Sequence, residues 1–461
     1  MHSRILAAGA VVALLTVACG NAGSSKTTVT PTTKPGTPPI TEVTGAELKK
    51  NVPLSGVQGV TDSEIKVAVI TAGSNPLAGD YTTFEDGIQA YFNMINSQGG
   101  IYGRKLVISA SHNDGFVNNQ QTVKSSLAND HAFATFIASP LFYGANDIAA
   151  SNPPMPTFIW NINQEFAGKP NMFGNVGALC FSCKGQGLPF LAQSQGFTKV
   201  AALAYGSPAA SKNCAAGIKG SFEKYPSAKV VYFDDNLQLG QADLSAQVSQ
   251  MKDKGVQLIA TCIDQRETLI LAKELAKQHV NAVQSLPNSY DPEFAAENAK
   301  YFEGSFVAPQ FASLEYKPLL PTQQEFVDWM GKLGKRVFEI PGYGWIDALQ
   351  LVHGLKLAGP NFSQQKVIDS LNQDTAFDAD GMIEPIDWTI QHNDPTGPNG
   401  TTNAKVAGKY ICASTVKIHD GKFVPLPEVP AGKQWICLTG GPNAPTLTKT
   451  PEYMRFGPSA G

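Results

Sequence analysis

Cysteine is the residue type in this sequence that could do the most distinctive chemistry, and the chain has seven of them. One, Cys19, directly follows an apolar N-terminal run, which leaves six. An even number of cysteines in an oxidising compartment predicts disulfide bonds. The preferred pair is Cys412 with Cys437, because these two residues bracket a predicted hairpin. The other candidate pairs are Cys180 with Cys183 and Cys214 with Cys262.

Metal binding and catalysis find little support in the sequence. The Cys180/Cys183 spacing is also typical of half a zinc site, but it lacks a second spaced pair or a nearby histidine. The seven histidines are scattered, and His112 is the only one expected near a strand end. It could face a ligand there, but an exposed loop position is the preferred interpretation. The sequence has no HExxH, GxSxG, P-loop or GxGxxG motif. We therefore expect no metal, no cofactor and no enzyme activity.

Charge and composition exclude further classes of protein. The chain has 461 residues, with 35 Lys+Arg against 38 Asp+Glu, and its formal net charge is −3. Without a basic cluster, electrostatic binding of nucleic acid is not expected. A hydrophobic content of 43% with only 16% charged residues excludes a wholly disordered chain. The length is that of two or three domains with sizeable cores.

The N-terminus predicts export. Arg4 precedes an apolar run over Ile5–Ala18, which is too short for a membrane span of about 20 residues. We interpret residues 1–18 as a signal peptide and the Ala18-Cys19 junction as similar to a lipobox, with lipid on Cys19. The alternative is ordinary cleavage without a lipid. Residues 19–59 then form a tether rich in Ser, Thr and Pro, which places the folded body outside the cytoplasmic membrane on a lipid anchor.

The body alternates apolar, β-branched runs with amphipathic helical patterns. The predicted strands are Ile65–Ile70, Lys105–Ser111, Phe133–Ala138, Pro156–Trp160, Lys199–Ala204, Ala228–Phe233, Val256–Cys262 and Gly304–Pro309. Apolar residues recur at helical spacing from Phe84 to Ile95, and Gln265–Gln278 and Gly342–Leu357 show the same pattern. Alternating buried strands and helices predict α/β structure, and the number of strands favours two doubly wound parallel sheets.

Several segments resemble one known family. The strand at Ile65–Ile70 is followed by a helix and then by the run INSQGGIYGRKL at 95–106. This arrangement resembles the opening of the type I periplasmic binding proteins, in particular the leucine/isoleucine/valine-binding proteins of ABC transporters. The segments 342–350, 381–388 and 417–425 are also similar to that family. The resemblance extends from about Thr61 to Leu426.

The resemblance implies a clamshell in which two α/β lobes, joined by three crossovers, close on a small-molecule solute. We assign residues 60–176 and 311–384 to lobe 1, and residues 177–310 and 385–461 to lobe 2. The implied partners are the solute and the permease subunits of an ABC transporter. The membrane is contacted through the N-terminal lipid only, and the protein is expected to be a monomer. The alternative is a ligand-sensing, receptor-like binding protein that is not coupled to transport.

Ligands of open α/β sheets bind beyond the carboxyl ends of the strands. The candidate ligand residues of lobe 1 are Ser74, Asn75, Tyr81, Ser139, Leu141, Phe142, Tyr143, Trp160, Asn161 and Asn163. Amino-acid binders of the family place a serine for the substrate carboxylate where Phe142 or Tyr143 stands here. They also carry a run of small residues where this chain has the bulky Trp160.

The candidate ligand residues of lobe 2 are Tyr205, Ser207, Asp264 and Tyr290. Ser207 either contacts the ligand or caps the helix that follows it, and Asp264 either takes a ligand amine or caps the next helix. The family's carboxylate for the ligand amine is replaced by the segment around Tyr290. The solute is therefore either similar to a branched-chain amino acid or an aromatic, apolar or amide-type molecule, and the aromatic replacements favour the second class slightly.

Overall fold

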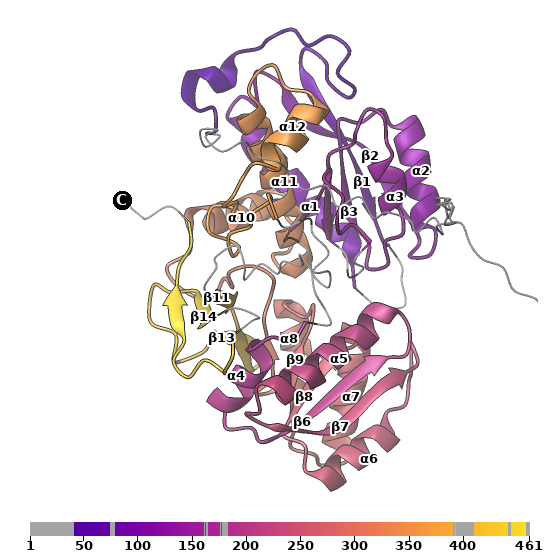
Figure 1. The fold of residues 1–461 in the computed structure, drawn as a ribbon, viewed down its shortest axis with the longest axis vertical. Helices are drawn as coiled ribbons and strands as arrows, with labels where there is room; N and C mark the ends of the chain where they lie inside the picture. Colours follow the sequence, from indigo (N-terminus) through magenta and orange to yellow (C-terminus); the bar gives the residue numbers. More distant parts are fainter. Residues whose placement is uncertain are drawn as a thin grey trace, which may run out of the picture.

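The computed structural model describes residues 41–73, 79–160, 162, 165–175, 177, 183–390, 392, 410–440 and 444–457. Two α/β bodies, lobe 1 and lobe 2, lie end to end (Figure 1). Each contains its own sheet, so the predicted α/β fold with two lobes is confirmed. Within these described ranges, no helix is both long enough and apolar enough to cross a membrane.

Lobe 1 contains a parallel sheet of five strands in the order β2-β1-β3-β4-β5. The strands are β1 Glu64–Thr71, β2 Lys105–Asn113, β3 Ala134–Ala138, β4 Thr157–Trp160 and β5 Met172–Gly174. The accompanying helices are η1 Gly45–Lys49, η2 Tyr81–Thr83, α1 Phe84–Ser97, α2 Asn119–Asn129, α3 Ala145–Ala149, α10 Pro321–Lys332, α11 Glu339–Ala358 and α12 Gln364–Leu371. Helices α1 and α11 cover one face of the sheet and α2 and α3 the other, so the central strands are buried on both faces.

Lobe 2 contains a sheet of seven strands in the order β13-β12-β10-β9-β8-β6-β7. The strands are β6 Lys199–Tyr205, β7 Lys229–Leu237, β8 Leu258–Cys262, β9 Val283–Leu286, β10 Phe306–Val307, β12 Val416–His419 and β13 Lys422–Pro425. The helices are α4 Gly187–Ser194, α5 Ala209–Lys224, α6 Ser245–Lys254, α7 Gln265–Lys277, α8 Pro292–Glu297 and α9 Ala299–Phe302. The strands from β7 to β10 are parallel, and β12 and β13 extend the sheet as an antiparallel hairpin.

A third, antiparallel sheet lies beside lobe 2 and consists of β11 Tyr410–Ala413, β14 Trp435–Thr439 and β15 Glu452–Met454. The predicted disulfide between Cys412 and Cys437 is present here, and it joins directly opposed residues of β11 and β14. The two strands are not the arms of one simple hairpin, however. The chain between them also forms the β12–β13 hairpin, which belongs to the large sheet of lobe 2.

The run at 95–106 has a structural explanation. Helix α1 ends at Ser97, and Gly99 and Gly100 both adopt positive φ angles that let the chain reverse toward β2. Arg104 is fully buried, and its guanidinium donates to the carbonyl oxygens of Thr61 and Val52 at 2.7 and 2.8 Å. The motif therefore fixes the start of the folded body onto lobe 1.

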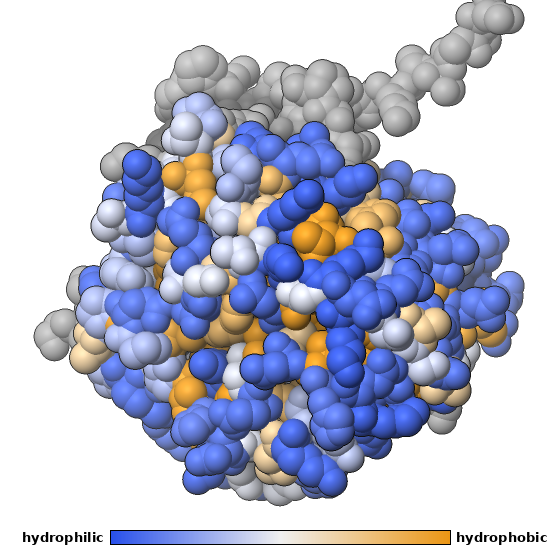
Figure 2. Space-filling view, turned by 90° about the horizontal axis from the view of Figure 1, so that it is seen from below, coloured by the Kyte–Doolittle hydropathy of each residue, from blue (hydrophilic) through white to orange (hydrophobic). Residues whose placement is uncertain are grey.

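The outer end of lobe 2 is mainly hydrophilic, with hydrophobic residues scattered between polar ones (Figure 2). Across the described residues, only four large hydrophobic side chains are exposed: Val117, Tyr143, Phe233 and Leu239. Leu239 lines the cavity between the lobes, whereas Val117 and Tyr143 are in lobe 1 loops that contribute neighbouring residues to it. Three of these four side chains are thus in or next to segments that line the space between the lobes, whereas Phe233 on β7 is not.

Candidate functional site

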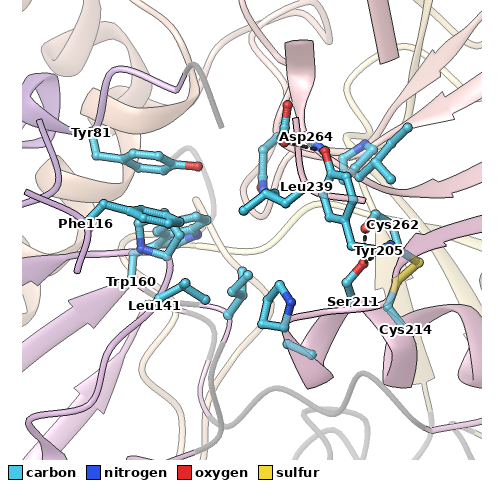
Figure 3. A pocket seen from close by; sticks show the side chains of 17 residues that line it. Tyr81, Phe116, Leu141, Trp160, Tyr205, Ser211, Cys214, Leu239, Cys262 and Asp264 are labelled. Atoms are coloured by element: carbon cyan, nitrogen blue, oxygen red, sulfur yellow. Dashed lines mark hydrogen bonds between the residues drawn. A yellow bond between two sulfur atoms is a disulfide. The ribbon is translucent and has the colours of Figure 1, made fainter. Parts of the chain in front are cut away.

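A cavity of about 100 Å³ lies between the carboxyl ends of the two main sheets (Figure 3). Lobe 1 contributes Tyr81, Phe116, Pro140, Leu141, Trp160 and Ile162. Lobe 2 contributes Tyr205, Pro208, Ala210, Ser211, Cys214, Leu239, Cys262, Ile263, Asp264, Pro287 and Asn288. The lining is mostly apolar, and it contains no lysine, arginine or histidine among the described residues. This is the position at which open α/β sheets bind ligands.

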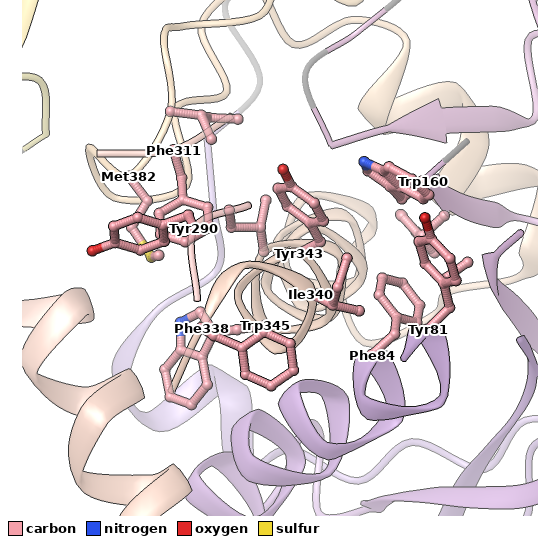
Figure 4. Close-up of a cluster of buried hydrophobic side chains, with 14 of the residues drawn as sticks. Tyr81, Phe84, Trp160, Tyr290, Phe311, Phe338, Ile340, Tyr343, Trp345 and Met382 are labelled. Carbon is pink, nitrogen blue, oxygen red and sulfur yellow. The ribbon is translucent and has the colours of Figure 1, made fainter. Parts of the chain in front are cut away.

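The lobe 1 wall is built on Trp160, the last residue of β4. Its ring is stacked between Tyr81 and Tyr343, with centroid distances of 5.1 and 5.8 Å (Figure 4). Trp160 is only 1% exposed, and its Nε1–H has no hydrogen-bond partner anywhere in the described structure. A buried donor is costly to leave unpaired, which makes this N–H a candidate donor to an acceptor on a bound solute.

The lobe 2 wall is built on Tyr205, the last residue of β6, and on Asp264, which follows β8. The hydroxyl of Tyr205 donates to Oδ2 of Asp264 at 2.5 Å. Oδ1 of Asp264 accepts the backbone N–H groups of Arg266 and Glu267, so Asp264 also caps helix α7. Burial, together with Glu267, raises the pKa of Asp264 to about 8, and burial next to Asp264 raises the pKa of Tyr205.

A disulfide reinforces this wall. Cys214 on α5 is bonded to Cys262 at the end of β8, and both residues line the cavity. The hydroxyl of Ser211 donates to the carbonyl of Cys262 at 2.6 Å and accepts the N–H of Tyr205 at 2.9 Å. The start of α5 is therefore held against two neighbouring strand ends, which keeps the wall rigid.

A more polar chamber of about 200 Å³ adjoins the apolar cavity and shares Tyr81, Asp264 and Asn288 with it. Its other lining residues are Gly79, Asp80, Gln265, Tyr290, Asp291, Arg336, Phe338, Glu339 and Ile340. Burial raises the pKa of Glu339 to about 7, although its carboxylate accepts from the Tyr343 hydroxyl and the Tyr290 N–H. The space between the lobes thus has an apolar part and an acidic part.

Six of the predicted ligand residues lie at this site. Tyr81, Leu141, Trp160, Tyr205 and Asp264 line the apolar cavity. Tyr290 lies in the polar chamber, where its hydroxyl donates to Glu315 at 2.7 Å. Both alternatives considered for Asp264 are compatible, since it caps α7 and also faces the cavity.

Four predicted ligand residues do not line either space. Ser139 is buried and its hydroxyl donates to Asp114, and Phe142 packs into the core on the opposite face of the sheet. Tyr143 is 44% exposed. Ser207 is exposed and is not a helix cap, because α5 begins at Ala209 with Pro208 at the N-cap position. Four further candidates, Ser74, Asn75, Asn161 and Asn163, lie outside the described residues, as do Cys19 and Cys180.

The sequence did not identify several lining residues, notably Phe116, Ser211 and Leu239. Phe116 follows β2, where the sequence pointed to His112. His112 instead lies 2.6 Å from the Asp130 carboxylate, and Phe116 reaches the cavity from a left-handed conformation with φ of 70°. The segment after β2 does contribute to the cavity, as the position of ligand sites in such sheets predicts. The residue type of Phe116 did not distinguish it from other apolar loop residues.

Only one group of described residues is spaced to hold a metal ion, namely Glu303, His419 and Asp420. All three are exposed on lobe 2, outside the linings of both spaces between the lobes. They already bond to one another, with His419 Nδ1 2.8 Å from Glu303 and the Asp420 N–H donating to Glu303 at 2.9 Å.

Comparison with known proteins adds the following. The sequence profile of the family described as periplasmic binding protein matches residues 64–408. The branched-chain amino acid binding protein LivJ of Streptococcus pneumoniae, solved with isoleucine, has a TM-score of 0.62 and 14% identity over 86% of this chain and 100% of that one. A fatty acid ABC transporter substrate-binding protein of Thermomonospora curvata has a TM-score of 0.60 and 18% identity over 82% and 98%. At these identities the likeness concerns the fold. No curated protein sequence matches the chain.

Proposed function

Because this chain belongs to the periplasmic binding protein family, we propose that it is the solute-binding component of an ABC transporter, which captures a small molecule and delivers it to a permease. The observation that carries this proposal is the cavity between the carboxyl ends of the two sheets, walled by Trp160 on one lobe and by Tyr205 and Asp264 on the other. A site divided between two lobes binds most tightly when the lobes close, because only the closed form makes both sets of contacts.

The solute we propose is mainly apolar or aromatic. Leu141, Leu239 and the part of the Trp160 side chain that lines the cavity offer apolar contact to a bound solute. The loop after β3, where the resemblance led us to expect a serine in an amino-acid binder, presents Pro140 and Leu141 to the cavity instead. The unpartnered Nε1–H of Trp160 would orient a solute oxygen.

The cellular setting completes the proposal. We propose that residues 1–18 are removed, that Cys19 carries the lipid and that residues 19–40 tether the body outside the cytoplasmic membrane. The expected tether over 19–59 is too long, because Glu42 contacts His353 and Val52 accepts from Arg104 of lobe 1. Residues 60–176 with 311–384 form lobe 1, together with the segment from Glu42 and with Trp388, which contact His353 and Phe173 of that lobe. Residues 177–310 and most of 385–461 form lobe 2. The protein acts as a monomeric carrier without catalysis, and its macromolecular partner is the permease.

A thermal-shift screen of the purified protein tests the proposed solute class. The panel contains branched-chain amino acids, aromatic and apolar acids, amides, alcohols and amines. A solute that binds only the folded protein raises the melting temperature with concentration. We expect apolar or aromatic solutes to give the largest shifts, and a largest shift with leucine, isoleucine or valine would contradict the solute class.

A matched pair of variants locates the binding. Leu239→Ala removes an exposed side chain that lines the cavity, and Phe233→Ala removes one of similar exposure, 36% against 38%, that does not. The first variant should weaken binding of a solute from the screen several-fold, because it removes apolar contact area. The second should bind as the unmodified protein does. Equal affinities for all three proteins would place the site elsewhere.

A further inference from the structure

The third sheet lies between α10 of lobe 1 and α4 of lobe 2 (Figure 1). On the lobe 2 side, Ile436 and Leu438 of β14 belong to one buried apolar cluster with Phe306 of β10. The side chain of Gln186, the N-cap residue of α4, accepts the N–H of Thr448 at 2.7 Å. The third sheet is therefore anchored to lobe 2 by apolar contact and by hydrogen bonds.

The same strand is also attached to lobe 1. Successive side chains of a strand point to opposite faces, so Trp435 faces away from the side on which Ile436 lies. Trp435 shares a buried apolar cluster with Leu320, the N-cap residue of α10. Directly before β14, the fully buried side chain of Gln434 donates to Oε1 of Gln323 on α10 at 2.8 Å. Strand β14 thus contacts both lobes.

The segment after β15 adds polar contacts to lobe 1. The guanidinium of Arg455 donates to the carbonyl oxygens of Pro318 and Leu319 at 2.8 and 3.1 Å, just before α10. The N–H of Gly457 donates to Oδ2 of Asp378 at 3.1 Å, in the segment that follows α12. Hydrogen bonds with one charged partner are stronger than neutral ones, so these contacts hold the end of the segment on lobe 1.

The sheet between the two attachments is reinforced. The disulfide between Cys412 and Cys437 joins β11 to β14, and β15 pairs with the other edge of β14. The N–H of Cys412 also donates to Oε2 of Glu384 at 3.4 Å, at the boundary between the lobes. The sheet begins at Tyr410, beyond the last residue, 408, that the family profile matches. It is thus a cross-linked addition to the matched body that spans both lobes.

The lobes also meet directly beside the polar chamber. The N–H of Glu339 on α11 donates to the carbonyl oxygen of Tyr290 in lobe 2 at 3.0 Å. Arg336, before α11, pairs with Asp291 and Glu293 at the start of α8. These bonds join lobe 1 to lobe 2, so they break when the lobes separate at this point.

We propose that the third sheet, together with the segment that ends at Gly457, is a strap that limits how far the two lobes open. In hinge motions a few residues between the lobes absorb the change. Here the motion must also pull the strap away from α10 or from α4. The strap therefore favours the arrangement in which both cavity walls face each other before a solute is bound. This inference concerns the empty protein and goes beyond the proposed solute capture.

Small-angle X-ray scattering and hydrogen exchange of the purified protein without solute test the strap. The double variant Arg455→Ala with Phe456→Ala removes the guanidinium contacts and a ring whose centroid lies 5.6 Å from that of Trp435. We expect a larger radius of gyration, because the lobes open further. The Glu339 amide should exchange about threefold faster or more, because its acceptor is in the other lobe.

The matched control for this variant is Lys449→Ala with Glu452→Ala. Both side chains are exposed on the same part of the chain, and neither makes the contacts described above. The control should have the radius of gyration and the Glu339 exchange rate of the unmodified protein. Far-ultraviolet circular dichroism shows whether each variant is folded.

A second pair of variants tests the attachment to lobe 2 and keeps every ring in place. The Tyr225 hydroxyl donates to the carbonyl oxygen of Ala444 in the strap at 2.9 Å, so Tyr225→Phe should also accelerate exchange at Glu339. The Tyr102 hydroxyl makes a similar bond within lobe 1, to Leu355 at 3.1 Å. Tyr102→Phe should therefore leave the exchange rate of Glu339 unchanged.

The inference is wrong if the folded double variant keeps either the radius of gyration or the Glu339 exchange rate of the unmodified protein. It is also wrong if a control changes as much as its matched variant. If the double variant does not fold, the comparison of Tyr225→Phe with Tyr102→Phe decides. No solute enters these measurements, so a failed thermal-shift screen would overturn solute capture without affecting the strap.

Discussion

His353 on α11 joins the start of the folded body to lobe 1 through two carboxylates. Its Nδ1 lies 2.6 Å from Glu42 and its Nε2 lies 2.6 Å from Asp374. Burial lowers the pKa of His353, but the hydrogen bonds to Asp374 and Glu42 outweigh it and raise the pKa from 6.5 to about 9. A tenfold change in proton affinity corresponds to about 1.4 kcal/mol. The ionised ring therefore stabilises the fold by about 3 kcal/mol, in full below pH 6.5, and this contribution is lost as the pH rises through 9.

His353→Gln should accordingly lower the free energy of unfolding by about 3 kcal/mol at pH 6 and by much less at pH 10. Urea unfolding followed by tryptophan fluorescence measures this difference, and Trp345 on the same helix reports on lobe 1. His419→Gln is the control, because His419 also contacts carboxylates, Glu303 and Asp420, but is exposed on lobe 2. It should change stability little at either pH. An equal cost of His353→Gln at pH 6 and pH 10 would refute the ionic role of this ring.

Three further substitutions test other parts of the structure. Gly344→Ala places a Cβ 2.0 Å from a backbone oxygen of α1, so it should lower the free energy of unfolding by about 2 kcal/mol in the same urea assay. Gly331→Ala adds a Cβ that meets nothing within 4 Å, so it should raise the free energy of unfolding by about 0.5 kcal/mol. Replacing Cys412 and Cys437 together by serine removes a link across 25 residues and should lower the free energy of unfolding by about 3 kcal/mol; an unchanged urea midpoint would contradict this. Trp160→Phe keeps a ring but removes the unpartnered N–H, so calorimetry should show about tenfold weaker binding of an oxygen-bearing solute from the screen, and equal affinity would remove the indole N–H from the site.

Hydrophobic periodicity was enough to predict the strands that carry the cavity. The apolar runs at Lys199–Ala204 and Val256–Cys262 correspond to β6 and β8, and Pro156–Trp160 corresponds to β4. These strands are buried on both faces, so each appears in the sequence as a continuous apolar run. Because ligands of such sheets bind beyond the strand ends, the strand ends and the resemblance to the binding-protein family together identified Trp160 and Asp264 as candidates.

Shorter elements and loop orientation could not be predicted in this way. Strand β5 has three residues, and the third sheet depends on pairing between segments far apart in the chain. Within the loops, long-range partners decide which side chain faces the cavity. Ser139 is turned away by Asp114, whereas Leu239 reaches the cavity from the segment after β7. Local sequence contains neither interaction, so neighbouring loop residues could not be told apart.

The central claim is that a small apolar solute binds between Trp160 on lobe 1 and Tyr205 with Asp264 on lobe 2. The most direct test is a crystal structure of the protein with a solute selected by the thermal-shift screen. We predict electron density for the solute against the Trp160 ring, with its polar end at the Asp264 side. A third cavity, of about 140 Å³, lies between α4 and the third sheet, away from the space between the lobes. Solute density there, with the interlobe cavity unchanged, would contradict the account.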